Sequence, residues 1–245
     1  LPAGSYSLVT AGNVAGTRVA GTVDAYTASN FWGAEWNIAG PLYKSDNFGL
    51  EALVGFRYLG LNDLFELSTT SVVGGGIGTF DRFSTTNNFY GGQVGLRFLW
   101  SNDRWAALFA TKLGMGDTQN NLSIRGNSSL PAGYPGVQLP GGIYTSSANL
   151  GTSQTDHFGV VVDLNAGLRF ALNHAIGISV GYNFLYWSGL TRAGDQVSSV
   201  INPALSPVLN GPIGGAGTGP LQPQRLQDVT DFWAHGVNFG LDIRF

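Results

Sequence analysis

Cysteine is absent from this chain of 245 residues, and charged residues are scarce. Without cysteine there are no disulfides and no thiolate metal sites, so the redox state of the compartment stays open. Asp, Glu, Lys and Arg make up 11% of the residues, against about 25% in soluble domains. The formal net charge is -3 without a basic stripe, which argues against a nucleic-acid partner. The three histidines are scattered, so we expect no transition-metal site and no cofactor.

A long apolar run is also missing. No stretch approaches the roughly 18 apolar residues of a membrane-spanning helix, so a membrane-spanning form of this chain must be a closed β-barrel. What the chain has instead is 43% hydrophobic residues and 37 glycines, about twice the usual glycine frequency. The length fits one large all-β domain over residues 1–245, and two domains are not required.

The last fifteen residues, 231–245, set the pattern for the rest. From Trp233 onward every second residue is large and mostly apolar, and the residues between are small or polar. This period of two predicts a strand with one apolar face, and aromatic residues at both ends are typical of a lipid-facing strand. The chain ends on Phe245. A terminal aromatic of this kind resembles the signal that the outer-membrane insertion machinery recognises, so we expect that machinery and outer-membrane lipid as partners.

The same alternation predicts an antiparallel transmembrane β-barrel. Thr17–Ala28 is either a separate edge strand, which would give eight strands, or the start of one long strand that continues into Asn30–Ile38. We favour the long strand because no tight-turn dipeptide separates the two segments. Single-chain bacterial barrels have an even number of strands, so we expect that these residues do not close a barrel by themselves. The seven strong strands cover residues 30–38, 48–58, 90–100, 105–115, 158–170, 176–186 and 233–245.

The connections alternate between short and long. We predict short periplasmic turns at 40–46, 101–103 and 172–174. The extracellular parts would be residues 1–29, a loop or strand extension, and long loops at 60–88, 117–156 and 188–230 within the barrel region 30–245.

Two sets of side chains follow from this register. The outward set would form a membrane girdle, and the inward polar set would line the lumen. The predicted girdle is Trp32, Trp36, Phe48, Tyr58, Tyr90, Trp100, Trp105, Phe158, Phe170, Tyr186, Trp233 and Phe245. The predicted lumen lining is Glu35, Glu51, Arg57, Gln93, Arg97, Lys112, Asp163, Arg169, Asp242 and Arg244. Because both signs of charge occur, the lining is either a selective constriction or a self-neutralising network, and we favour the network.

Several segments resemble the β-barrel porin family seven of bacterial outer-membrane proteins. They are FWGAEWN at 31–37, LVGFRYLGL at 53–61, DRFSTTNNFYGGQVGLR at 81–97, YNFLYWSGLTRAGDQV at 182–197 and TDFWAHGVNFGLDIRF at 230–245. The resemblance covers nearly the whole chain in order. It implies the outer membrane of a Gram-negative-type bacterium, and a further N-terminal portion that would bring the complete barrel to about ten strands.

Three functions are compatible with these patterns. The leading hypothesis is a low-specificity diffusion pore or a structural surface protein, without enzymatic activity. The first alternative is a barrel enzyme at the outer leaflet, for which His157 beside Asp156, or His235, would be the catalytic base. The second is a secreted, soluble β-sandwich that binds a ligand through its long loops. The sequence leaves open whether the protein forms a homo-oligomer.

Overall fold

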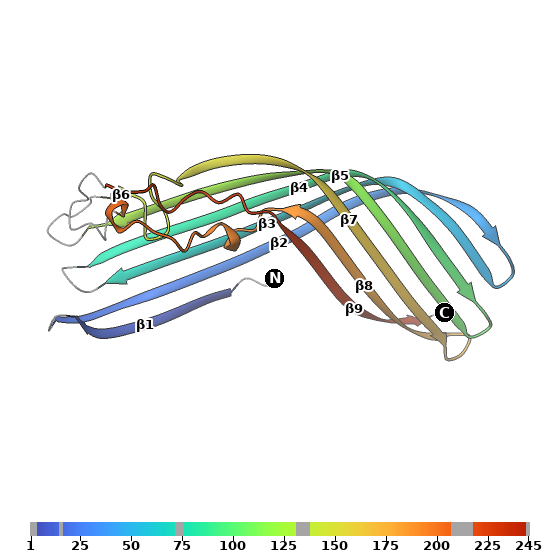
Figure 1. Ribbon diagram of the computed structural model, residues 1–245. Helices are drawn as coiled ribbons and strands as arrows, with labels where there is room; N and C mark the ends of the chain where they lie inside the picture. The colour runs from blue at the N-terminus through green and yellow to red at the C-terminus, as the bar shows by residue number, and fades with distance from the viewer. Residues whose placement is uncertain (1–3, 15–16, 72–75, 131–137, 207–217, 244–245) are drawn as a thin grey trace.

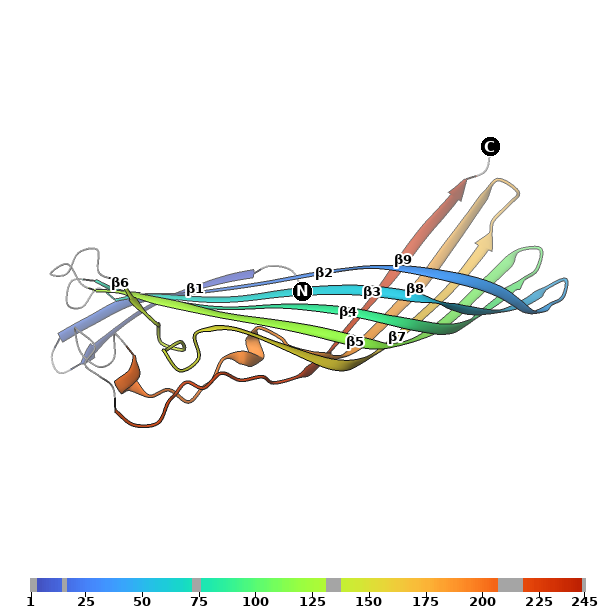
Figure 2. The ribbon, with the colours of Figure 1, turned by 90° about the horizontal axis from the view of Figure 1, so that it is seen from above.

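The computed structural model describes residues 4–14, 17–71, 76–130, 138–206 and 218–243. These residues form one antiparallel sheet in the order β1-β2-β3-β4-β5-β7-β8-β9, with the short β6 beside β5. Figures 1 and 2 show that the sheet is strongly curved. Seven strands make up the curled half-barrel, as the sequence predicts. In the part of the chain that the structure describes, no helix is long and apolar enough to cross a membrane.

The strands are longer than the segments of alternating apolar and polar residues from which they were predicted. Each strand pairs with the next along the chain, except that β5 pairs with both β6 and β7. Two short 3-10 helices, η1 (Gly194–Gln196) and η2 (Pro203–Leu205), lie between β8 and β9. The strands are β1 Gly4–Val14, β2 Thr17–Lys44, β3 Phe48–Ser71, β4 Ile77–Ser101, β5 Trp105–Ser129, β6 Gln138–Pro140, β7 Gly151–Ala171, β8 Ile176–Leu190 and β9 Thr230–Ile243.

The convex face carries an exposed apolar band between two aromatic belts. In the belt far from the short turns, the ring of Tyr58 lies 4.8 Å from Trp32 and 5.0 Å from Tyr90. In the belt near the turns, the rings of Trp105 and Phe170 are 4.5 Å apart. Aliphatic and aromatic side chains between the belts stay exposed, including Phe239 at 83%. A soluble protein rarely exposes so wide an apolar surface, and a lipid-facing barrel wall requires it.

The strands extend well past the far belt, where the sequence predicted loops. The expected loop 60–88 is mostly the end of β3 and the start of β4, which pair in register as far as Ser71 and Ile77. The expected loop 117–156 is likewise shortened, because β5 continues to Ser129. Both faces of these extensions carry polar residues, so the period of two that marks a half-buried strand disappears there. Backbone pairing holds the extensions together nevertheless.

The predicted single strand over 17–38 is confirmed, because β2 runs unbroken from Thr17 to Lys44. The predicted turn at 40–46 is wrong for residues 40–44, which belong to β2. The strand continues through that segment with a register shift between Pro41 and Tyr43. Proline has no N–H to donate, and this part of β2 lacks a strand on its outer side in the described residues, so Pro41 interrupts no pairing there.

The sheet has two edges. β9 pairs with β8, and among the described residues it pairs with no second strand. β1 covers β2 only as far as Thr27. The expectation that 231–245 does not pair with Thr17–Ala28 is therefore confirmed for 231–243. Side chains of the two edges meet near the far belt, where the rings of Phe31 and Phe232 are 5.2 Å apart. A single curved sheet with an exposed convex face also replaces the alternative of a two-sheet sandwich.

Candidate pore lining

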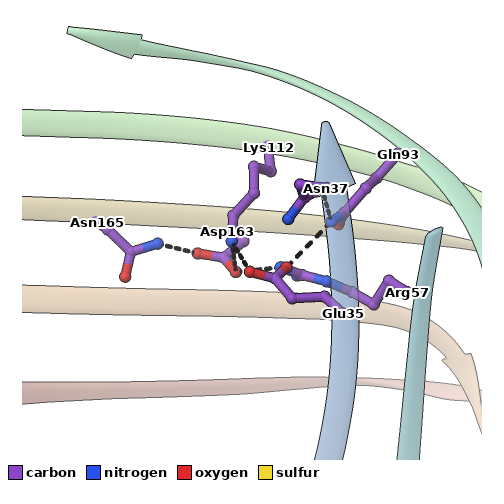
Figure 3. A network of polar contacts seen from close by, with 7 residues as sticks. All are labelled: Glu35, Asn37, Arg57, Gln93, Lys112, Asp163 and Asn165. Carbon is purple, nitrogen blue, oxygen red and sulfur yellow. Dashed lines mark hydrogen bonds and ion pairs between the residues drawn. The ribbon is translucent and has the colours of Figure 1, made fainter. Parts of the chain in front are cut away.

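Five neighbouring strands each place one polar side chain at the same level of the concave face. Backbone register sets Glu35 of β2 opposite Arg57 of β3, and Lys112 of β5 opposite Asp163 of β7. Gln93 of β4 lies between these two pairs. Side chains of strands that are not neighbours can meet only on the inside of a curved sheet. The contacts between the two pairs therefore show that this face is the concave one (Figure 3).

The four charged groups form a closed ring of alternating sign. The Arg57 Nη2 group donates to a carboxylate oxygen of Glu35 and, at 2.5 Å, to Oδ2 of Asp163. The Lys112 ammonium lies 2.6 Å from Oε1 of Glu35 and 3.2 Å from Oδ2 of Asp163. Each cation thus touches both carboxylates, and the formal charge of the ring is zero.

Neutral amides complete the ring. Gln93 Nε2 donates to Glu35 Oε2 at 3.0 Å and to Asn37 Oδ1 at 2.6 Å, and Asn165 donates to Asp163. The Arg57 side chain is 4% exposed, so its charge is almost wholly removed from solvent. A buried charge is tolerated only where partners and hydrogen bonds replace its hydration. This arrangement fits the self-neutralising network that we favoured from the sequence.

Between this charge ring and the short turns, the concave face forms a groove of about 1020 Å³. Its walls include Glu51, whose carboxylate accepts from Arg97 Nε at 2.6 Å, and Arg169, whose Nε lies 2.8 Å from Asp242. Eight of the ten predicted lining residues therefore belong to ion pairs. Gln93 is the ninth, and Arg244 lies outside the described residues.

On the other side of the charge ring, the lumen is filled by an apolar layer built around Phe89. A Cβ at Gly91 would overlap the Phe89 ring, and one at Gly159 would lie 3.1 Å from it. Glycine at these positions lets the ring lie flat across β4 and β7. The Trp187 ring packs edge-on against Phe89, with centroids 6.2 Å apart, and its Nε1 donates to Thr118 Oγ1 at 3.1 Å. Leu59, Leu61, Val161, Leu190 and Phe232 complete the layer.

The sequence did not predict this layer. The predicted girdle includes Tyr186, which is half-buried on the convex face, whereas the next residue, Trp187, is fully buried on the concave face. One signal was available: Trp187 has the opposite parity to the outward Tyr182, Phe184 and Tyr186. An aromatic residue on the inward parity of a barrel strand indicates a filled lumen.

A segment of the β8–β9 connection, residues 191–206, lies on the concave face of the extensions, and we call it the strap (Figure 1). The Asn87 amide donates to Thr191 O at 3.0 Å and accepts from Thr191 N at 2.9 Å. Arg192 forms an ion pair with the buried Asp63 and lies over the Phe232 ring. Of the predicted loop 188–230, residues 188–190 belong to β8 and Thr230 to β9, and the strap that follows β8 is held against the strands.

A second inward segment, residues 141–150, is held by Asp81 of β4. The fully buried Asp81 carboxylate accepts from Thr145 Oγ1 at 2.6 Å and from the backbone N–H of Ile143 and Tyr144 at 3.0 and 3.2 Å. Ser206 Oγ of the strap donates to Gly142 O at 3.1 Å, so the two inward segments contact each other. Together they cover the lumen side of the extensions.

With the exception of Trp36, the predicted girdle residues that the structure describes lie at the two belts of the convex face. Phe158 and Trp233 are strongly exposed, at 71% and 61%, and Phe245 is outside the described residues. Trp36 differs from the prediction, since it lies between the belts and is 65% exposed. The half-buried Phe48, Tyr58 and Phe170 lie against neighbouring aromatic rings. The hydroxyl of the half-buried Tyr186 donates to Asp231 Oδ2 at 2.8 Å.

The histidines do not form a catalytic pair. His235 stacks on Trp233 on the convex face, with ring centroids 5.5 Å apart. His157 shares the parity of Gly159 and Val161 and therefore lies on the concave face. An acid–base pair requires both groups on one side of the sheet, within hydrogen-bond reach of a common atom. In the residues described, no cluster of His, Asp and Glu could hold a metal ion.

Comparison with known proteins adds a family. The family model described as "Putative beta barrel porin-7" matches residues 5–245, nearly the entire chain. The chain belongs to this family. The match confirms the resemblance drawn from the five sequence segments, and the family's β-barrel character agrees with the curved antiparallel sheet. No curated protein and no solved structure shows a significant match.

Proposed function

We propose that this member of the porin-7 family is an outer-membrane β-barrel that acts as a narrow diffusion pore with little charge selectivity. The observation that carries the proposal is the contrast between the two faces of one sheet. The convex face is apolar and bounded by aromatic belts, whereas the concave face holds the neutral charge ring and, beside it, a groove of about 1020 Å³. A wall of this kind separates lipid from water.

The lengths of the connections between strands indicate how the barrel is oriented in the membrane. Short turns join β2 to β3, β4 to β5 and β7 to β8, and long connections or extended strands lie at the opposite end. Outer-membrane barrels place their short turns in the periplasm, so the extensions and the strap would face the cell exterior. The groove then opens toward the periplasm, and the apolar layer and strap form the outer barrier.

Weak charge selectivity follows from the pairing of the inward charges. Selective pores present unpaired charges of one sign to the solute. In the described lining, the charge ring is neutral and two further ion pairs flank the groove. Buried polar atoms without a partner, Thr85 Oγ1, Gln93 Oε1 and Asn120 Oδ1, occur on the same face. Such atoms are normally hydrogen-bonded to water, which supports a wet interior.

The apolar layer and the strap favour a second candidate, a structural surface protein whose lumen is closed. Conductance of the purified, full-length protein in a planar bilayer separates the two. A pore gives discrete steps and a reversal potential near zero in a salt gradient. No steps, with the protein shown to be inserted, would support the structural role, and strong selectivity for one ion sign would contradict the neutral lining.

A further inference from the structure

The convex face of the extensions carries a row of exposed, neutral polar side chains directly beyond the far belt. One row crosses five strands in register: Asn30 pairs with Asn62, Asn62 with Thr86, Thr86 with Asn121 and Asn121 with Gln154. All five side chains are exposed, and none makes a hydrogen bond in the described structure. The concave face of the same strands is covered by the strap and by residues 141–150.

The row continues the lipid-facing surface. On β4, Thr86 lies four residues before Tyr90 of the far belt on the same face, and on β2, Asn30 lies two residues before Trp32. Four residues correspond to about 13 Å along a strand, or roughly 10 Å of height for a strand tilted by about 40°. The polar headgroup region of a phospholipid leaflet is only about 5 to 8 Å deep. Phospholipid alone therefore does not reach the centre of the row.

The next rows add aromatic and cationic groups. Arg82 of β4 lies directly opposite Arg125 of β5 on the convex face. Like charges in this position destabilise a sheet unless an anion is shared. Glu66 pairs with Arg82 at 3.3 Å, while Arg125 is exposed. Tyr26, opposite Glu66, presents a partly exposed ring.

We propose that this convex face binds the saccharide portion of the glycolipid in the surrounding outer leaflet. Amides and hydroxyls are the groups that pair with sugar hydroxyls, an aromatic ring packs on a sugar face, and the exposed Arg125, beside the Arg82–Glu66 ion pair, matches the anionic groups of such glycolipids. The position of the row identifies the ligand as part of a membrane lipid, because the row directly continues the far belt, which already lies at the lipid interface. The inference rests on the outer-membrane location in the proposed function.

The absence of cysteine makes the surface testable by site-specific labelling. Single cysteines at Thr86→Cys and Asn121→Cys probe the row. Val94→Cys probes the apolar band, and Ser199→Cys probes an exposed site on the strap. The full-length protein is inserted into vesicles of phospholipid alone, of phospholipid with glycolipid reduced to its lipid anchor, or of phospholipid with glycolipid carrying its full saccharide. The rate of alkylation by a water-soluble maleimide is then measured.

The proposal predicts that the row cysteines react about tenfold more slowly only where the saccharide is present, the equivalent of about 1.4 kcal/mol. Ser199→Cys should keep its rate, and Val94→Cys should be protected in every vesicle. Row rates that do not depend on the saccharide, or that fall together with the strap rate, would overturn the saccharide proposal while leaving the barrel intact. A reactive Val94→Cys would instead overturn the membrane register and with it both proposals.

Discussion

Glu35 and Asp163 lie on strands separated by three others in the sheet, yet both accept a hydrogen bond from the same Nη2 atom of Arg57. This contact requires a strongly curved sheet, because a flat sheet would keep β2 and β7 several strand widths apart. The charge ring consequently lines the lumen and also joins β2, β3, β5 and β7 across it.

Removing one member of the ring should destabilise the protein and give the pore a charge preference. Arg57→Gln leaves two carboxylates facing one ammonium, and breaking a buried ion pair in this way costs about 3 to 5 kcal/mol. The ring then carries a net charge of −1, so the reversal potential in a KCl gradient should shift toward cation selectivity. Urea unfolding in vesicles and bilayer recordings measure the two effects.

Arg97→Gln is the matched control for that substitution. The Arg97 side chain is 37% exposed, and an exposed pair contributes only about 0 to 1 kcal/mol. Equal losses of stability in the two variants would contradict the distinction between the buried ring and the open pair.

The two faces of the sheet should differ in their tolerance of charge. Phe239→Arg places a cation on the exposed apolar band, at an expected cost of about 2 to 4 kcal/mol near the bilayer midplane. Gly167→Arg is the control on the concave face, since a Cβ there meets nothing within 4 Å. Folded fractions in vesicles at increasing urea give the comparison, and an equal effect of both variants would show that the register is wrong.

The register of the strands could be predicted because the sequence alternates strictly between the two belts. The extensions could not, since segments such as Asn62-Asp63 and Thr85-Thr86-Asn87 are polar on both faces and lose the period of two. The inward charges were identified individually, but the partners of Glu35 depend on which strands the curvature brings together. The sequence did not predict that the strap is held by Asn87, Asp63 and Arg192, because their contacts join residues far apart in the chain.

The apolar layer should limit conductance. Phe89→Ala removes a fully buried ring from the lumen, so the single-channel conductance should increase, while stability falls by about 3 to 5 kcal/mol. Phe56→Ala removes a ring of the same size from the convex face of the adjacent strand and should leave conductance unchanged. Unaltered conductance in the Phe89 variant would mean that the solute path bypasses this layer.

Protease added to intact cells should test the strap. The short turns at 101–103 and 172–174 should be spared because we predict them to be periplasmic, and cleavage over 191–206 should be slow while the strap is held against the strands. Asn87→Ala removes both hydrogen bonds to Thr191, which contribute about 0.5 to 1.5 kcal/mol each, so cutting there should accelerate roughly tenfold. The exposed Thr86→Ala change is the control, and acceleration by both variants would argue against a specific anchor.

The docking of residues 141–150 should depend on pH through Asp81. Burial raises the pKa of the Asp81 carboxyl, and hydrogen bonds from Thr145 and from the backbone of 143–145 oppose part of that rise. A carboxyl with a raised pKa in the folded state contributes stability below its unfolded pKa of about 3.9, and this stability is lost as pH rises through the folded value.

Hydrogen-exchange protection of the amides 143–145, corrected for intrinsic exchange rates, should therefore decrease as pH rises above about 4. Asp81→Asn should abolish this slope, whereas Asp24→Asn on the exposed convex face should preserve it. Protection that increases with pH in the unmodified protein would reverse the sign of the argument.

The order of the sheet has a consequence for assembly. Apart from the short β6, every described strand pairs with its sequence neighbours, so the wall can be laid down hairpin by hairpin, with short turns at one end and longer connections from β5 to β7 and from β8 to β9 at the other. The charge ring is different, because it needs β2, β3, β5 and β7 together. A slip of one residue in any hairpin would turn one of its charges toward lipid. The charge ring therefore forms only when the hairpins that contribute its residues have the correct register.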